Sequence, residues 1–214
     1  MSVCKDILHD HLADCPIVAI LRGITPDEVV PIGRALIGAG VGIIEIPLNS
    51  PAPFESIHRL AQEVGKQALV GAGTVLTISD VAKVKEAGGQ LVVSPNTDVA
   101  VIAATVQADM VSIPGFFTPT EAFAAIHAGA SALKLFPAEA ASPAVIKAQR
   151  AVLPTSTPLL VVGGVQADDV TAWLSAGANG FGLGGALYRP GQSASDVFAQ
   201  AQSFVTALWL ADAK

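Results

Sequence analysis

The chain has 214 residues, of which 51% are hydrophobic and 14% are charged, and 18 Asp and Glu against 12 Lys and Arg give a net charge of −6. This length suits one large domain with a sizeable core, and the scattered basic residues argue against a nucleic-acid partner. Gly, Pro or charged residues interrupt every apolar run before the ~18 residues of a membrane span, so no membrane association is expected.

A helix over residues 3–12 is predicted to come first. Eight short apolar segments follow, with starts 20 to 26 residues apart, at 16–21, 42–46, 68–73, 90–94, 110–113, 132–136, 158–162 and 180–184. Nearly continuous apolar runs of this length are typical of parallel strands, because both faces of such strands are buried.

Helices are predicted between these strands. In residues 25–40, Thr25 is expected to be the N-cap and Pro26 the first helical residue, with glycines near the end. Residues 77–89 and 166–180 repeat this layout, and a last helix is predicted over 194–211.

Eight strand–helix units favour a (β/α)8 TIM barrel with an extra N-terminal helix, formed by residues 1–214 as a single domain. A doubly wound open sheet is the alternative. Its first strand often ends in a G-x-G-x-x-G turn, whereas the first strand here ends in AILRGIT.

Lys134 lies in the middle of the apolar segment ALKLF, residues 132–136. Because side chains alternate along a strand, Lys134 is expected to face the barrel interior with Ala132 and Phe136, while Leu133 and Leu135 face the helices. A structural ion pair or a side chain that reaches water would explain such a lysine. A nucleophilic amine is the other explanation, since desolvation favours the neutral form that attacks a ketone to give a Schiff base.

Glu45 repeats this anomaly near the carboxyl end of the segment GIIEI, which in a barrel is the active face. It could be a structural partner of Lys134 or Arg22. It could also transfer protons if burial raises its pKa towards neutrality. An ionised Glu45 would keep Lys134 charged and Arg22 would act in the opposite direction, and the sequence leaves the balance open.

Other candidate binding residues follow the strands. Arg22 and Thr74 close the first and third strands and could hold a carboxylate, although a surface ion pair and a helix or turn cap are their simpler roles. Two glycine pairs follow the seventh and eighth strands, where backbone amides near helix N-termini form the usual phosphate site of this barrel, although turns also need glycine. The pairs are Gly163, Gly164, Gly184 and Gly185.

Two cysteines, Cys4 and Cys15, and an N-terminus without the apolar segment of a signal peptide favour a reducing cytoplasm. The four histidines show no metal-ligand spacing. Covalent chemistry without a metal or another cofactor is therefore expected.

A set of motifs resembles the class I 2-keto-3-deoxy-6-phosphogluconate/galactonate aldolases over residues 16–193: AILRGITPDE, EIPLNSP, GAGTVL, SPN, ALKLFPAE, VVGGV and GLGGALYRPGQS. The resemblance implies a homotrimeric (β/α)8 barrel that cleaves a 2-keto-3-deoxy-6-phospho sugar acid into pyruvate and glyceraldehyde 3-phosphate. It implies that Lys134 is the Schiff-base lysine and Glu45 the proton-transfer residue. The substrate contacts it implies are Arg22 and Thr74 for the pyruvyl part, the nearby Pro95, Phe136 and Val162, and Gly163, Gly164, Gly184 and Gly185 for the phosphate.

Departures from the gluconate branch indicate the galactonate branch of this family. The gluconate branch typically reads Glu-Val-Thr-Leu-Arg-Thr where residues 45–50 read Glu-Ile-Pro-Leu-Asn-Ser, and has a Thr in place of Val162. Many relatives also have a Ser in place of Gly185, so this chain lacks one hydroxyl donor to phosphate. An enzyme for the gluconate epimer or for both epimers is the main alternative, and a non-catalytic phosphosugar-binding barrel is a third. A phosphosugar isomerase on this fold would need no inward lysine.

Overall fold

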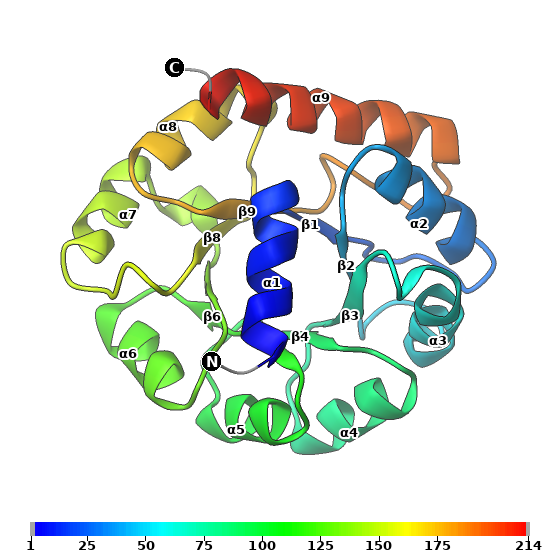
Figure 1. The fold of residues 1–214 in the computed structure, drawn as a ribbon, viewed down its shortest axis with the longest axis horizontal. Coiled ribbons are helices and arrows are strands. Elements are labelled where there is room, and N and C mark those ends of the chain that lie inside the picture. Colours follow the sequence, from blue (N-terminus) through cyan, green and yellow to red (C-terminus); the bar gives the residue numbers. More distant parts are fainter. Residues whose placement is uncertain (1–2, 213–214) are drawn as a thin grey trace.

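Nine parallel strands form the sheet of the computed structural model, which describes residues 3–212 (Figure 1). The strands are β1 (Ile17–Ile20), β2 (Ile43–Pro47), β3 (Leu69–Gly73), β4 (Leu91–Val93), β5 (Val111–Ile113), β6 (Gly115–Phe116), β7 (Leu133–Leu135), β8 (Leu159–Val162) and β9 (Gly180–Leu183). Their order is β5-β4-β3-β2-β1-β9-β8-β7-β6, so the two ends of the sheet are consecutive in the chain.

The barrel closes at the segment that the sequence predicts as its fifth strand. The predicted segment, 110–113, contains β5, which pairs with β4, and Pro114 separates it from a short continuation, β6, which pairs with β7. The N–H groups of Ser131 and Lys134 donate to the carbonyls of Ser112 (2.8 Å) and Pro114 (2.9 Å), which joins the two halves. The predicted barrel is therefore confirmed, and its fifth strand is counted twice because proline has no N–H for the ladder.

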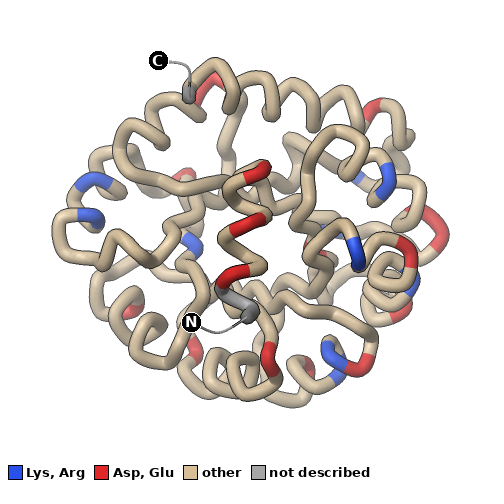
Figure 2. The backbone as a smooth tube through the Cα atoms, viewed as in Figure 1, with Lys and Arg blue, Asp and Glu red and all other residues tan. Residues whose placement is uncertain are grey.

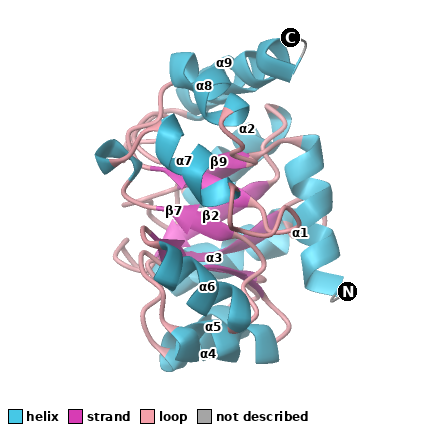
Figure 3. Cartoon of the chain, turned by 90° about the vertical axis from the view of Figure 1, so that its left-hand side faces the viewer, coloured by secondary structure: helices cyan, strands magenta, loops and turns pink. Residues whose placement is uncertain are grey.

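Helices surround this barrel as an outer ring (Figures 1 and 3). They are α1 (Val3–Asp14), α2 (Val29–Gly38), α3 (Pro53–Val64), α4 (Ile78–Glu86), α5 (Val99–Gln107), α6 (Pro119–His127), α7 (Pro143–Arg150), α8 (Val170–Ser175) and α9 (Ala194–Asp212), with 3₁₀ turns η1 (Ala138–Ala140) and η2 (Ala167–Asp169). The exception is α1, which lies across the amino-terminal end of the barrel instead of in the ring. The extra N-terminal helix that the sequence predicts is thus present.

Two apolar layers hold the fold together. The inner layer fills the barrel, and Leu8 and Leu12 of α1 close its lower end against Val18, Ile43 and other inward side chains. The outer layer lies between the strands and the helices and contains Leu133 and Leu135 of β7. Since Ala132 belongs to the inner layer, the predicted alternation along this strand is confirmed.

The first helix of the ring begins later than the sequence predicts. Residues 25–28 form a turn in which the Glu28 and Val29 N–H groups donate to the Thr25 carbonyl, and α2 begins at Val29. Pro31 has no N–H to donate to the residue 27 carbonyl, so a regular helix starting at Pro26 would lack that hydrogen bond. The predicted N-cap role of Thr25 in α2 is therefore wrong.

Charged residues lie mainly on the outer helices and loops, where acidic and basic residues are dispersed, and acidic residues also lie along α1 (Figure 2). Within residues 3–212 no helix has the length and apolar character needed to cross a membrane. The carboxyl ends of the strands form one rim of the barrel, and each residue that the sequence selects as a candidate for chemistry lies on or beside this rim.

Candidate active site

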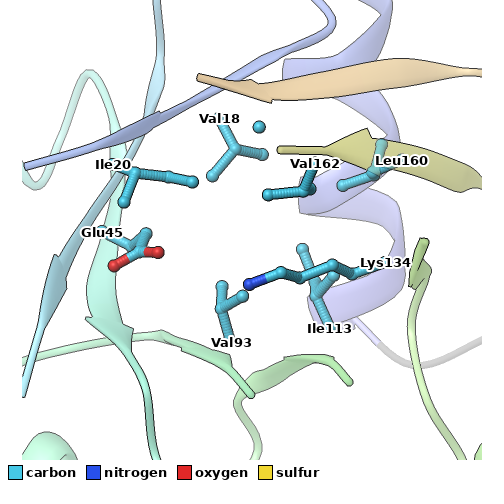
Figure 4. A pocket seen from close by; sticks show the side chains of 9 residues that line it. Val18, Ile20, Glu45, Val93, Ile113, Lys134, Leu160 and Val162 are labelled. Carbon is cyan, nitrogen blue, oxygen red and sulfur yellow. The ribbon is translucent and has the colours of Figure 1, made fainter. Parts of the chain in front are cut away.

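Lys134 from β7 and Glu45 from β2 point into the same space inside the barrel (Figure 4). The remaining walls are apolar side chains and one glycine: Val18, Ile20, Val93, Ile113, Leu160, Val162 and Gly182. The enclosed volume is about 10 Å³, close to the least that holds one water molecule. The space beside the amine is therefore too small for a whole substrate molecule, most of which would lie above it at the rim.

The Glu45 carboxyl is almost completely removed from water, with 2% of its surface exposed. Its Oε2 atom is buried and has no hydrogen-bond partner. Burial raises the pKa of Glu45 from the ordinary 4.5 to about 7, although the positive charges of Lys134 and Arg22 lower it. A carboxyl that titrates near neutral pH can both give and take a proton, which is the property the sequence hypothesis requires.

Lys134 is also buried, with 7% of its surface exposed. Desolvation lowers the pKa of its amine below the ordinary 10.5, and Arg22 lowers it further, while Glu45 raises it. The amine lies 4.8 Å from the centre of the Phe136 ring, two residues further along the same strand face. The sequence leaves open whether Glu45 or the opposing effects decide the charge of Lys134. In the structure the net effect lowers the pKa of Lys134, which makes its neutral form easier to reach.

Lys134 and Glu45 face each other without forming an ion pair. The three ion pairs made by side chains of the described residues all involve arginines of the outer helices. Figure 4 shows the lysine nitrogen directed across the cavity towards the Glu45 side of the barrel. The simple structural explanation, a buried salt bridge, therefore does not account for these two residues.

Glycines in β3 and β9 make room for these side chains, and sequence reasoning did not assign them to the site. A Cβ atom on Gly73 would lie 1.9 Å from Oε2 of Glu45, so only glycine leaves space for the carboxylate. A Cβ atom on Gly182 would lie 2.7 Å from a methyl group of Val162. The alternate glycines of the segment GAG at 71–73 were a visible signal, but their meaning depends on which strand lies beside them.

Arg22 lies two residues beyond the end of β1, at the rim. Its Nη1 atom donates to Oδ1 of Asn49 in the loop after β2 at 2.6 Å, and the N–H of Gly23 donates to Oγ of Ser50 at 2.9 Å. The guanidinium is exposed and forms none of the ion pairs of the described residues, so its other N–H groups can bind an anion. Asn49 was visible in the sequence as a branch difference, but not as the partner of Arg22.

Thr74 and Pro95 follow β3 and β4 at the same rim, and both are half-buried. Thr74 has a φ of +56°, a left-handed conformation that is rare for a β-branched residue and is found mostly at functional sites. The N-cap of α4 is Thr77, whose hydroxyl accepts from the Asp80 N–H, so the capping role considered for Thr74 belongs to Thr77.

Gly163–Gly164 and Gly184–Gly185 lie side by side, because β8 and β9 that precede them are paired. Among the described residues, neither the Gly164 nor the Gly185 N–H is the donor of a backbone hydrogen bond outside helices and strands. Gly163 and Gly164 have positive φ angles of +114° and +67°, and a Cβ atom on either would clash with Glu139. The first pair precedes the 3₁₀ turn η2, while the second opens a turn at 185–187 and α9 begins only at Ala194, so the expected helix N-terminus is absent there.

The family model described as "KDPG and KHG aldolase" matches residues 8–199. The chain belongs to this aldolase family. It is 49% identical over 182 residues to the probable 2-dehydro-3-deoxy-6-phosphogalactonate aldolase of Rhizobium meliloti (strain 1021), covering 85% of this chain and 86% of that protein. It is 47% identical over 192 residues to the 2-dehydro-3-deoxy-6-phosphogalactonate aldolase of Escherichia coli (strain K12), covering 90% and 94%.

The fold of the chain also matches a solved structure described as native KDPGal. The TM-score is 0.91 with 46% sequence identity, over 93% of this chain and 97% of that one. The predicted family, the barrel and the aldolase activity are therefore confirmed. In this aldolase the rim and the interior bring together an amine, a carboxyl, a guanidinium and free backbone amides, which are the groups that an imine-forming aldolase acting on a phosphorylated acid requires.

Proposed function

We propose that this aldolase cleaves 2-dehydro-3-deoxy-6-phospho-D-galactonate into pyruvate and D-glyceraldehyde 3-phosphate through a Schiff base on Lys134. The observation that carries this proposal is the buried, unpaired Lys134 amine facing the buried Glu45 carboxyl at the barrel mouth. The names of the two relatives at 47% and 49% identity support the choice of substrate.

The first half of the reaction forms the imine. The neutral amine attacks the C2 carbonyl carbon and gives a carbinolamine, and Glu45 supplies the proton with which the hydroxyl leaves as water. Desolvation lowers the pKa of Lys134 and raises that of Glu45, so both groups are held closer to the protonation states that these steps need. Arg22 binds the C1 carboxylate beside the amine.

The second half breaks the C3–C4 bond. Glu45, now ionised, takes the proton of the C4 hydroxyl, directly or through a water molecule, and the bonding electrons move to the imine nitrogen, which leaves an enamine and glyceraldehyde 3-phosphate. Protonation of the enamine at C3 and addition of water to the imine then release pyruvate and regenerate Lys134. Each proton that Glu45 takes up can be given back within one turnover, because its pKa lies near 7.

Val162 supports the galactonate epimer as substrate. It is buried in the wall of the active-site cavity, directly before the Gly163–Gly164 pair, and presents only methyl groups. A threonine at this position could bond to the C4 hydroxyl of one epimer, and a valine cannot. Such a missing hydrogen bond changes discrimination by roughly 1–3 kcal/mol when its partner is left unpaired.

We assign the phosphate to the two glycine loops, which follow the paired strands β8 and β9 and whose Gly164 and Gly185 N–H groups donate no backbone hydrogen bond outside helices and strands within residues 3–212. We also assign contacts with the substrate to Pro95, Phe136 and Thr74, which follow their strands at the same rim. A Cβ atom on Gly185 would meet no atom within 4 Å, so the hydroxyl that many relatives have there is missing without a steric reason.

The test is a coupled pyruvate assay on both C4 epimers, together with borohydride trapping of pyruvate. The expected results are pyruvate release mainly from the galactonate epimer and a reduced adduct on the peptide that contains Lys134. Lys134→Ala should remove both signals, while Lys147→Ala on the exposed side of α7 should remove neither. Normal pyruvate release by Lys134→Ala would exclude the Schiff-base scheme, and preferred cleavage of the gluconate epimer would exclude the substrate.

We further infer a cytoplasmic homotrimer. The family resemblance supports the trimer, and the low cysteine content supports a reducing compartment. Exposed apolar side chains at the rim, among them Leu76, Ile78 and Val99, offer surface for contacts between subunits. Light scattering coupled to size exclusion gives the number of subunits, and a monomer at micromolar concentration would contradict this inference.

A further inference from the structure

Glu28 joins two loops that are far apart in the sequence. Its Oε2 atom accepts hydrogen bonds from the N–H (3.0 Å) and the hydroxyl (2.6 Å) of Thr25, three residues before it. Its Oε1 atom accepts from the N–H of Gly191 at 3.2 Å, in the loop that follows β9. The first two bonds are local and close the turn before α2, whereas the third spans 163 residues.

These two loops carry opposite ends of the proposed substrate site. The loop after β1 contains Arg22, and the loop after β9 begins with Gly184 and Gly185. They also pack against each other, since a Cβ atom on Gly23 would lie 2.8 Å from the ring of Pro190. The Gly191 bond therefore connects the loop for the carboxylate end of a substrate with the loop for its phosphate end.

We propose that Glu28 is a positioning residue that fixes the loop of residues 184–191 relative to Arg22, and so sets the span between the phosphate and carboxylate subsites. This inference rests on the proposed function. Glu28 itself touches no reacting atom, since it lies half-buried at the start of α2. Its effect on the substrate passes through Gly191 and the turn that opens at Gly185.

The charge of Glu28 suits this role. Its hydrogen bonds from Thr25 and Gly191 keep the pKa of the carboxyl below its ordinary value, so the group is ionised at neutral pH. The negative charge, after burial, also contributes to raising the pKa of the neighbouring Tyr188 to about 12. An ionised carboxylate accepts at both oxygens, and a hydrogen bond to a charged group is the stronger kind.

The chain offers a matched control in α6. Glu121 accepts the same two local hydrogen bonds, from the N–H and the hydroxyl of Thr118 at 2.8 and 2.9 Å, but its other bond comes from the N–H of the nearby Phe117. Removal of either carboxylate costs the two local hydrogen bonds from a threonine at the start of a helix or of the turn before it. Only removal of Glu28 releases a loop of the proposed phosphate site.

The experiment compares Glu28→Ala, Glu28→Gln and Glu121→Ala by two kinetic measurements. In Glu28→Ala, KM for the phosphorylated six-carbon substrate should rise about tenfold, the loss of one hydrogen bond to a charged group. Borohydride trapping of pyruvate alone, which needs no phosphate, should keep its rate within about twofold. Glu28→Gln keeps one acceptor oxygen and should fall between wild type and Glu28→Ala, and Glu121→Ala should change neither measurement.

Amide hydrogen exchange supplies a readout that does not depend on catalysis. Peptides covering residues 184–191 should exchange faster in Glu28→Ala than in wild type, and at the wild-type rate in Glu121→Ala. An unchanged KM, equal changes in KM and pyruvate trapping, or the same pattern in Glu121→Ala would overturn the positioning role. A wild-type protein that neither releases pyruvate nor traps it would refute the proposed function instead, while exchange would still decide whether Glu28 holds the loop.

Discussion

The buried carboxyl of Glu45 makes stability depend on pH in a direction that can be measured. Its pKa is about 7 in the folded chain and near the ordinary 4.5 when the chain is unfolded. Between these values the folded state binds more protons than the unfolded state, so the free energy of unfolding falls as the pH rises through this window. Glu45→Gln removes the titrating group and should remove this fall.

The size of the change in the free energy of unfolding follows from the shift of the Glu45 pKa. At 1.36 kcal/mol for each pH unit, the raised pKa corresponds to about 3 kcal/mol, with the attraction of Lys134 and Arg22 already included. Glu45→Gln should therefore gain stability relative to wild type by up to about 3 kcal/mol between pH 4.5 and pH 8. The change of this difference with pH is the informative quantity, since any packing cost of glutamine is the same at each pH.

The stability difference between Glu45→Gln and wild type is measured by urea unfolding at several pH values and at matched protein concentration. Glu86→Gln, on the exposed face of α4, is the control. The control should follow the wild-type curve. A difference between Glu45→Gln and wild type that stays constant from pH 4.5 to pH 8 would refute the conclusion that the carboxyl is held desolvated. The same result would weaken its assignment as a proton-transfer group that titrates near neutrality.

Substitutions at four positions test separate parts of the site. Arg22→Met should move the pH profile of kcat/KM to higher pH, because the guanidinium lowers the pKa values of both buried groups, while Arg22→Lys should keep the profile. Gly73→Ala should lower kcat at least about tenfold, since its Cβ atom would occupy the position of the Glu45 carboxylate, and a crystal structure should show that side chain displaced. Val162→Thr should change the ratio of kcat/KM between the two epimers by about 10- to 100-fold in favour of the gluconate epimer. Gly185→Ser should lower KM for the phosphorylated substrate severalfold and Gly185→Ala should not, because only serine adds a donor in the open space there.

The strands and the inward position of Lys134 could be predicted because they depend on local pattern. An apolar segment flanked by turn residues predicts a strand, and alternation along ALKLF decides which residues share a face. The split of the fifth strand could not be predicted, since it arises where the sheet closes and Pro114 has no N–H to donate. The start of α2 was misjudged because a Thr-Pro pair is a strong local helix signal, while Pro31 acts against it one turn later.

The candidate site also contains residues that local sequence identifies and residues that only contacts between segments reveal. Lys134 and Glu45 are conspicuous as charged residues in apolar segments, so composition alone selects them. Gly73 matters only because β2 pairs with β3 in a register that brings Glu45 beside it. The bond from Glu28 to Gly191 joins residues 163 positions apart, and no pattern within either segment indicates it. Contacts between loops therefore require the structure, even where each loop is evident in the sequence.

The barrel accommodates this destabilising pair because most of its apolar core lies away from the active site. Glu45 and Lys134 occupy the upper end of the inner layer, whereas Leu8 and Leu12 of α1 close its lower end and the outer layer holds strands against helices. Replacing Lys134 with Met would remove the desolvated amine and should raise the free energy of unfolding at neutral pH while ending catalysis. Lys134 and Glu45 form no ion pair with each other, and Gly73 preserves space for the carboxylate. A direct contact would satisfy both charges and leave no room for the carbon between them, so the separation is what makes the pair reactive.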